Sequence, residues 1–329
     1  MEASLDLSRW RETPKGVGAR RWTIIVTGLQ HLLRGRVFLI LTIAAWVAGL
    51  VVAAFGFLFT QSVATDGWLQ TFAENLGPRA EAMVSALGGL VTLYPDICIH
   101  GVFTFAFWIH SYLGLGLTLI ALTMVVPQLI ARDRASNALT IYLSRPLTST
   151  DYLIGKLGII AGVILMLWTG PLIFGWLTSM MLAPDRDFVV YSLAAFGHAL
   201  LFNAIALVAL AAIALGVSAL TRVGRVASII WISLWLVAGT MAKLPSSPSW
   251  LQHVSFSYDL SQVRQQMFRL DEALAAASAQ LPLLDQNLVR NLAATGTKAA
   301  PTDFTGALIG LALLTIAGSA AFLRRLRSE

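Results

Sequence analysis

Side chains with the greatest capacity for polar chemistry are concentrated in one segment of the 329-residue chain, residues 131–156. This central segment lies between two long apolar runs and contains charged and aromatic residues at Arg132, Asp133, Arg134, Tyr142, Arg145, Asp151 and Lys156. Gly155-Lys156 is followed by Leu157, without the upstream glycine and the following hydroxyl residue of a loop that binds nucleotide phosphates and magnesium. The segment therefore predicts a contact surface for a soluble partner rather than a nucleotide site.

Catalytic motifs do not stand out elsewhere in the sequence. It contains no HExxH, GxSG or GxGD pattern, and the nearest fragment, Gly216–Ala219, lacks the final glycine. The single cysteine, Cys98, cannot form an internal disulfide, and His110 has no second ligand at metal-binding spacing. We therefore expect no catalytic residue, no metal and no cofactor in this chain, and an intramembrane enzyme is a weak alternative.

Composition indicates the elements that must position the central segment. Hydrophobic residues make up 57% of the chain and charged residues 12%, and the mean hydropathy is +0.74. A helix that crosses a bilayer needs about 20 mostly apolar residues. The sequence therefore predicts an all-α polytopic membrane protein with six transmembrane helices, at about 37–59, 102–130, 157–181, 191–220, 226–242 and 304–323.

The regions outside these spans divide by charge. Residues 1–36, the central segment, the loop 222–225 and the C-terminus together contain 16 of the 23 basic residues. Short basic loops remain on the cytoplasmic side, so both termini are predicted to be cytoplasmic. The six-span domain, 37–329, then has two outer insertions, 60–98 and 243–303. The net charge of +6 is explained by these loops and acidic lipid headgroups, so no nucleic acid partner is expected.

Two amphipathic helices are predicted beside the spans. In residues 19–34 apolar residues recur at helical spacing between basic ones, which predicts a helix within the N-terminal region that lies at the inner membrane surface. A cytoplasmic cap packed on the bundle is the alternative. A second periodic stretch, 256–274, predicts a helix on the outer mouth of the bundle, with Gln262 and Arg264 among the polar residues between its apolar positions.

The central segment itself predicts a helix, a break and a second helix. Residues 131–143 fit a helix that ends at Arg145, because the residue before a proline, here Pro146, is disfavoured in helical conformation. Thr148 and Asp151 then fit a capping pair for the next helix. Such an element can pass movement of a soluble partner into the spans.

The central segment contains the pairs Asp133-Arg134 and Ala138-Leu139, the run from Tyr142 to Leu147 and the run from Asp151 to Lys156. In these residues it resembles the signature between the second and third spans of type-2 ABC exporter permeases. Many members have Glu-Arg followed by Gly-Thr-Leu-Glu, where this chain has Asp133-Arg134 and Asn137–Thr140, which leaves the subfamily and the cargo open. The six spans, the N-terminal amphipathic helix and the outer insertion before the last span are also similar.

The resemblance implies a permease subunit of the bacterial inner membrane that docks separate ATPase subunits, which hold the ATP and magnesium, and forms a homodimer or a heterodimer with a second permease. The expected docking residues are Arg132, Asp133, Arg134, Tyr142, Arg145, Pro146, Asp151 and Lys156. The second and fifth spans of such permeases line the route between protomers. Candidate path residues are therefore Tyr112, Thr118, Thr123, Ser228, Ser233 and Thr240, together with His110, whose alternative role is a hydrogen bond between helices.

A non-transporting membrane anchor for an ATPase-driven surface machine is the alternative function. It would need the same docking segment, so the sequence leaves this alternative open.

Overall fold

The computed structural model describes residues 16–64, 67–136, 148–242, 252–280 and 303–327, together with residues 244 and 248. These residues form helices and short connections, and no β-strand occurs among them. In chain order the helices are α1 (Val17–Leu33), α2 (Arg36–Gln61), α3 (Trp68–Leu76), α4 (Pro78–Leu93), α5 (Pro95–Val126), α6 (Arg132–Ala135), α8 (Ser149–Ile164), α9 (Gly170–Met181), α10 (Asp187–Leu220), α11 (Gly224–Ile232), α12 (Ala238–Ala242), α14 (Phe256–Phe268), α15 (Leu270–Gln280) and α17 (Phe304–Arg327). Three π-helical turns join neighbouring helices: η2 (Pro127–Ala131), η3 (Leu165–Thr169) and η4 (Ser233–Val237).

Six helices are long and apolar enough to cross a membrane. They cover Arg36–Gln61, Pro95–Ala135, Thr150–Met181, Asp187–Leu220, Gly224–Ala242 and Phe304–Arg325. The prediction of an all-α polytopic membrane protein with six spans is therefore confirmed. The second of these helices begins at Pro95, earlier than the predicted residue 102. Proline is favoured at the first helical position, because a backbone N–H there would have no partner within the helix and the fixed φ of proline is already helical.

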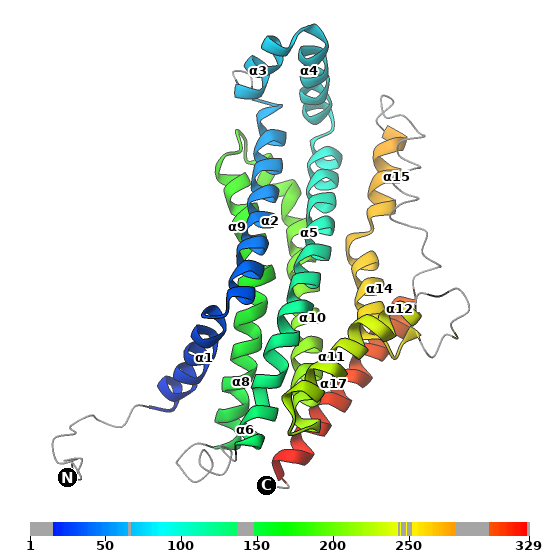
Figure 1. The fold of residues 1–329 in the computed structure, drawn as a ribbon. Coiled ribbons are helices and arrows are strands. Elements are labelled where there is room, and N and C mark those ends of the chain that lie inside the picture. Colours follow the sequence, from blue (N-terminus) through cyan, green and yellow to red (C-terminus); the bar gives the residue numbers. More distant parts are fainter. Residues whose placement is uncertain are drawn as a thin grey trace, which may run out of the picture.

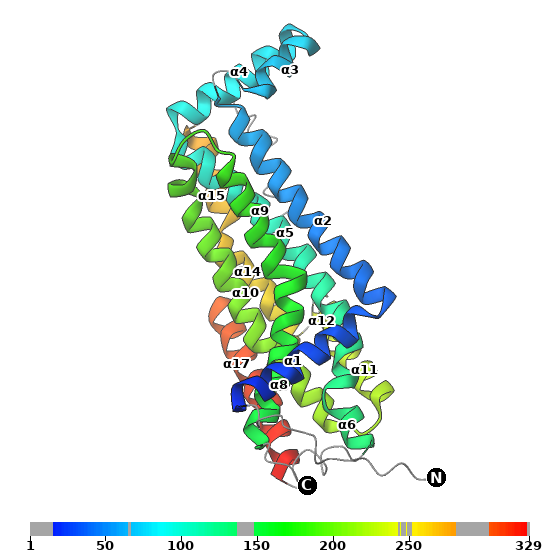
Figure 2. The ribbon, with the colours of Figure 1, turned by 90° about the vertical axis from the view of Figure 1, so that its left-hand side faces the viewer.

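Successive spanning helices run in opposite directions (Figure 1). The start of α1, the short helix α6 and the end of α17 lie at one end of the bundle, which we call the α6 end. At the opposite end α3 and α4 project beyond the spans, as the turned view also shows (Figure 2). Because six passes return the chain to its starting side, α1, the central segment and the end of α17 share one end.

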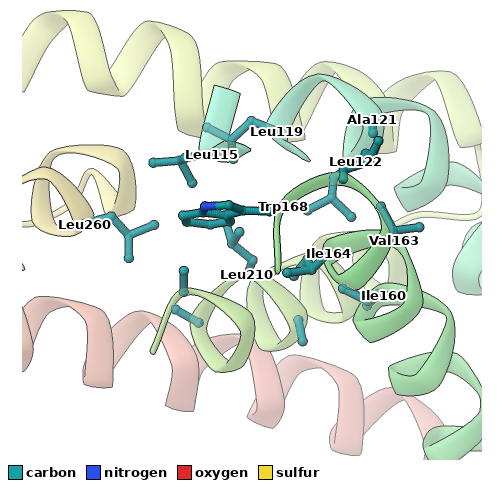
Figure 3. Packing of buried hydrophobic residues seen from close by; sticks show 14 of the residues in the cluster. Leu115, Leu119, Ala121, Leu122, Ile160, Val163, Ile164, Trp168, Leu210 and Leu260 are labelled. Atoms are coloured by element: carbon teal, nitrogen blue, oxygen red, sulfur yellow. The ribbon is translucent and has the colours of Figure 1, made fainter. Parts of the chain in front are cut away.

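A continuous apolar core joins the spans. At its centre Trp168, on η3, is fully buried among residues of α5, α10 and α14, including Leu115, Leu210 and Leu260 (Figure 3). A Cβ atom at Gly114 would collide with the Trp168 indole, so the absence of a side chain there lets the ring lie against α5. Close packing of this kind makes α5 and η3 neighbours that cannot separate without exposing a large aromatic side chain.

The position of α14 differs from the sequence prediction. The helix does not lie on the outer mouth of the bundle with its polar side in water; it packs against α17, α10, α5, η4 and α12. Gln262 and Arg264, predicted to occupy a polar face, are 5% and 4% exposed. The physical reason is the shortness of the fifth span, since α12 ends part of the way along the bundle (Figure 1) and α14 fills the space beside α5.

Candidate functional site

The central segment is described at both of its ends, Arg132–Ser136 and Thr148–Lys156. Tyr142, Arg145 and Pro146, three of the predicted docking residues, lie outside the described residues. The described ends meet α1 and α10 at the α6 end of the bundle (Figure 2). We call this region the α6 junction.

The end of α5 is joined to α10 by hydrogen bonds. The Ser218 hydroxyl accepts hydrogen bonds from the backbone N–H groups of Ile130 (2.9 Å) and Ala131 (3.2 Å) in η2. Arg134, only 8% exposed, donates from Nη1 to the Ala219 carbonyl at 2.7 Å. Arg134 therefore points into the protein, whereas its neighbour Arg132 is exposed to solvent. The sequence did not distinguish these two arginines.

The start of α8 has the predicted capping pair. The backbone N–H of Asp151 donates to the Thr148 hydroxyl at 3.2 Å, and the Thr148 N–H donates to Asp151 Oδ2 at 3.2 Å. The other carboxylate oxygen, Oδ1, accepts a hydrogen bond from Nε of Arg21 on α1 at 2.7 Å. Asp151 thus fixes the first turn of α8 and also binds α1 to it.

A second ion pair joins α6 to α8. Asp133 Oδ2 lies 2.7 Å from Nζ of Lys156, and it also accepts a hydrogen bond of 2.7 Å from the Tyr152 hydroxyl. The Asp133 and Lys156 side chains are 17% and 10% exposed. A charge-assisted network with so little solvent holds the two helices in one relative position. Sequence reasoning assigned no role to Tyr152, although its spacing of four residues from Lys156 places both on one helical face.

Glycines on α8 let α1 approach closely. A Cβ atom at Gly155, Gly158 or Gly162 would meet the side chain of Ile24, Ile25 or Leu29 respectively. The apolar stripe of the predicted amphipathic helix therefore packs on α8, which favours the alternative of a helix packed on the bundle. The spacing of these three glycines was visible in the sequence, but a glycine stripe indicates neither its partner nor its position.

A cavity of about 480 Å³ lies between α1, the end of α5 and α8. Its charged lining residues are Arg132, Asp133 and Lys156, all from the predicted docking set, and His31 on α1 joins them. Its apolar wall includes Leu32, Val125 and Ile159. The α6 junction therefore combines fixed ion pairs with a cavity that is polar at one end and apolar along its wall.

The candidate path residues do not form one continuous surface. His110 and Thr118 are buried within the bundle, where His110 Nε2 lies 3.3 Å from the Trp168 carbonyl oxygen. On the face shared by α5 and α11, the Ser228 hydroxyl donates to the Thr123 carbonyl at 3.1 Å. Three further candidates are exposed: Tyr112, Ser233 and Thr240.

Tyr112 covers an arginine that was not among the predicted site residues. The guanidinium carbon of Arg264 on α14 lies 3.3 Å from the centre of the Tyr112 ring, a cation–π contact. Burial lowers the pKa of Arg264 to about 10, which leaves the side chain charged at neutral pH. Its Nε and Nη1 atoms have no hydrogen-bond partner in the described structure. A buried cation with unused donors thus lies directly behind a candidate path residue.

A carboxylate–histidine group joins α14 to the start of α17. His253 Nδ1 lies 2.8 Å from Asp259 Oδ1, and its Nε2 lies 3.4 Å from Asp303 Oδ2. Burial raises the pKa of Asp259 to about 7, although the hydrogen bond from His253 opposes the shift. Gly306 and Gly310 on α17 provide the space, because a Cβ atom on either would collide with these carboxylates.

Comparison with known proteins assigns no family: no protein-family model matches the chain, and no curated protein matches it either. Within the described ranges no group of three or more His, Cys, Asp or Glu side chains is arranged to hold a metal ion. The fold and the site together define a multi-pass, all-α membrane protein with a charged junction at one end of its bundle.

Proposed function

We propose that this chain is the transmembrane permease subunit of an ABC-type exporter. In this proposal it lies in the bacterial inner membrane with both termini cytoplasmic and pairs with an identical or related permease. A separate ATPase subunit binds ATP and magnesium and docks on the central segment. The chain contributes no nucleotide site and no catalytic residue of its own.

The observation that supports this proposal most directly is that contacts of the central segment hold four helices together: α6, α8, α1 and α10. Asp133–Lys156 joins α6 to α8, Asp151–Arg21 joins α8 to α1, and Arg134 joins α6 to α10. A force applied to this segment is therefore distributed to the ends of the second, third and fourth spans at once. Mechanical coupling requires such fixed contacts, because a segment held by mobile side chains would absorb the movement of its partner.

The cargo in this proposal is amphiphilic or lipid-like. The described spans contain long apolar surfaces, and the exposed candidate path residues Tyr112, Ser233 and Thr240 supply single polar groups between them. Arg264 adds one buried positive charge behind Tyr112. A route with an apolar wall and few polar groups suits a molecule with an apolar body better than a hydrated ion.

The test is purification of the tagged chain from its own membranes, with identification of co-purifying ATPases and measurement of their activity. Arg132→Glu is the informative docking variant, because Arg132 is exposed and its reversal leaves the internal contacts of Arg134 intact. Arg225→Glu is the matched control, since Arg225 is an exposed arginine on α11, outside the α6 junction. We expect an ATPase to be recovered with the unaltered chain and the control, and to be lost with Arg132→Glu.

The outcomes separate the two functions considered. Recovery of an ATPase whose activity rises with an exported amphiphile supports the permease. Recovery of an ATPase that no candidate cargo stimulates, in a chain required for a surface machine, supports the non-transporting anchor. Recovery of the chain without any ATPase contradicts both.

A further inference from the structure

The cavity at the α6 junction is polar at one end and apolar at the other. Along α1 and α8 the chain runs away from the α6 end, and along α5 it runs toward that end (Figure 1). Thr23, Lys156 and Arg132 therefore lie at the end of the cavity nearest α6, and Leu32 and Val125 lie at the opposite end, deeper along the spans. The polarity of the cavity is thus oriented along the axis of the bundle.

The polar end has more positive than negative charge. Lys156 is paired with Asp133, so these two charges offset one another. Arg132 is exposed and has no ion-pair partner among the described side chains, and its guanidinium is the unneutralised charge of the cavity. The exposed imidazole of His31, beside Leu32 on α1, belongs to the lining at the other end of the cavity and adds no charge at the polar end. An anionic group at this end would complete the local charge balance.

The apolar wall sets the second requirement for a ligand. Leu32, Val125 and Ile159 line the wall, and each is less than 10% exposed in the structure. At about 480 Å³ the cavity is in the size range of small-molecule sites, roughly 300–1,000 Å³. A free phosphate ion would fill the polar end and leave this wall without contacts.

We propose that the cavity binds an acidic phospholipid, with the phosphate at Arg132 and the acyl chain along the wall formed by α1, α5 and α8. The orientation of the cavity matches that of a lipid in the leaflet at the α6 end, whose headgroup lies at the surface and whose chains lie deeper. Basic pockets between membrane helices bind headgroups of acidic lipids. This site goes beyond the proposed transport function and does not depend on it.

Binding at this position would act on the α6 junction. The lipid phosphate would lie beside the Asp133–Lys156 pair that links α6 to α8. The apolar chain would fill space between α1 and α8, the helices joined by Arg21 and Asp151. An acidic lipid would therefore stabilise the junction, and neutral lipid would not.

The experiment measures binding to the purified full-length chain in a non-ionic detergent by native mass spectrometry. Three probes are compared: dioctanoyl phosphatidylglycerol, dioctanoyl phosphatidylcholine and glycerol 3-phosphate. The second probe has the same chains without the net charge, and the third has the phosphate without chains. We expect the phosphatidylglycerol to bind at least about tenfold more tightly than either, since a single retained ionic contact of about 1.4 kcal/mol gives that ratio.

Two variants test the charge and the free space of the cavity separately. Arg132→Glu reverses the unneutralised charge, and Thr27→Phe fills the cavity from α1 while leaving its charges unchanged. Each is expected to weaken phosphatidylglycerol binding by about tenfold or more. Arg225→Glu, outside the cavity, should change it by less than about twofold. Melting temperatures of all variants identify any that fail to fold. If Arg132→Glu or Thr27→Phe fails to fold, the other of these two decides the result.

Three results would overturn the proposal. Equal binding of both lipids would show a site without charge selectivity. Glycerol 3-phosphate binding as tightly as phosphatidylglycerol would show a site for phosphate alone. Equal losses in Arg132→Glu and Arg225→Glu would show attraction to the basic surface in general.

Discussion

Two charged regions of this protein differ in how their charges are balanced. At the α6 junction Asp133 pairs with Lys156 and Asp151 pairs with Arg21, and both carboxylates accept further hydrogen bonds. On α14, Asp259 Oδ2 and two nitrogens of Arg264 are buried without partners. Unpartnered buried groups cost free energy, because they lose water and gain no replacement. The junction therefore contributes to stability, and the α14 group is retained at a cost to it.

Paired and unpaired charges also suit different roles for the α6 junction and for α14. A satisfied network holds helices in place, as coupling to a soluble partner requires. An unsatisfied buried cation behind Tyr112 is available to an acceptor that arrives from outside the chain. Four variants, ordered from the largest expected effect to the smallest, test this comparison.

Asp259→Asn tests the cost of the charge on α14. The folded-state pKa of about 7 is above the ordinary value, so the stability that the protonated carboxyl contributes is full below about pH 4 and is lost as pH rises through 7. Asn mimics the protonated form. We expect the variant to match the parent near pH 4, to be slightly more stable at pH 5, and to be more stable by about 4 kcal/mol at pH 8.

Apparent melting temperatures between pH 5 and 8 measure this effect. Asp271→Asn, at an exposed position on α15, is the control and should leave the pH dependence unchanged. His253 and Asp303 also face this group, and both are present in the parent and in Asp259→Asn. Identical pH slopes for the parent and Asp259→Asn would show that Asp259 is not the responsible carboxyl.

Lys156→Met tests the pairing at the α6 junction. The substitution leaves the Asp133 carboxylate largely buried without its cation, and we expect a loss of about 2–3 kcal/mol in unfolding free energy. The double variant Asp133→Asn/Lys156→Met removes both charges and should lose less than the single variant. Denaturation of all three proteins measures the coupling. A double variant less stable than Lys156→Met would mean that the two side chains act separately.

Gly310→Ala tests the space that α17 provides for α14. The added Cβ atom would collide with Asp259 Oδ2 and would lie 3.1 Å from the His253 carbonyl oxygen. We expect destabilisation of about 1–3 kcal/mol, typical of overpacking. Gly197→Ala, on α10, is the matched control because nothing lies within 4 Å of its added Cβ. Thermal unfolding compares them, and equal stability of the two variants would contradict a close contact between α14 and α17.

Arg21→Ala tests the most exposed contact of the junction. The Arg21 side chain is 36% exposed, so its ion pair with Asp151 is screened by solvent. We expect a loss of less than about 1 kcal/mol. Arg34→Ala, at an exposed position just after α1, is the control for a general loss of positive charge. If Arg21→Ala lost as much unfolding free energy as Lys156→Met, the contact between α1 and α8 would stabilise the junction as much as the contact between α6 and α8, contrary to this expectation.

Features that depend on nearby residues were predictable. The six spans follow from apolar runs, and the Thr148–Asp151 cap depends on residues three apart. Features that depend on distant residues were not. The contact of Arg134 with Ala219 joins positions 85 residues apart, and nothing local to Arg134 distinguishes it from the exposed Arg132.

The α14 helix shows where local reasoning fails. Its apolar period correctly predicted a helix, and its polar residues were assigned to a wet face. That assignment assumed water on one side, but α17, α10 and α5 cover the helix. The glycines that make room for it, Gly306 and Gly310, are on α17, and their function becomes visible only when α17 and α14 are together.

The sequence by itself determined the class of this protein, because transfer of a segment into lipid depends on the summed hydropathy of about 20 neighbouring residues. It also predicted a charged segment between the second and third spans. Only the tertiary structure decided which charges are paired, which of Arg132 and Arg134 is exposed, and that α14, a helix with many polar residues, is enclosed by the spans. The reason is physical: the cost of burying a charge depends on the partners that the fold brings within about 3 Å of it, and those partners come from distant parts of the chain.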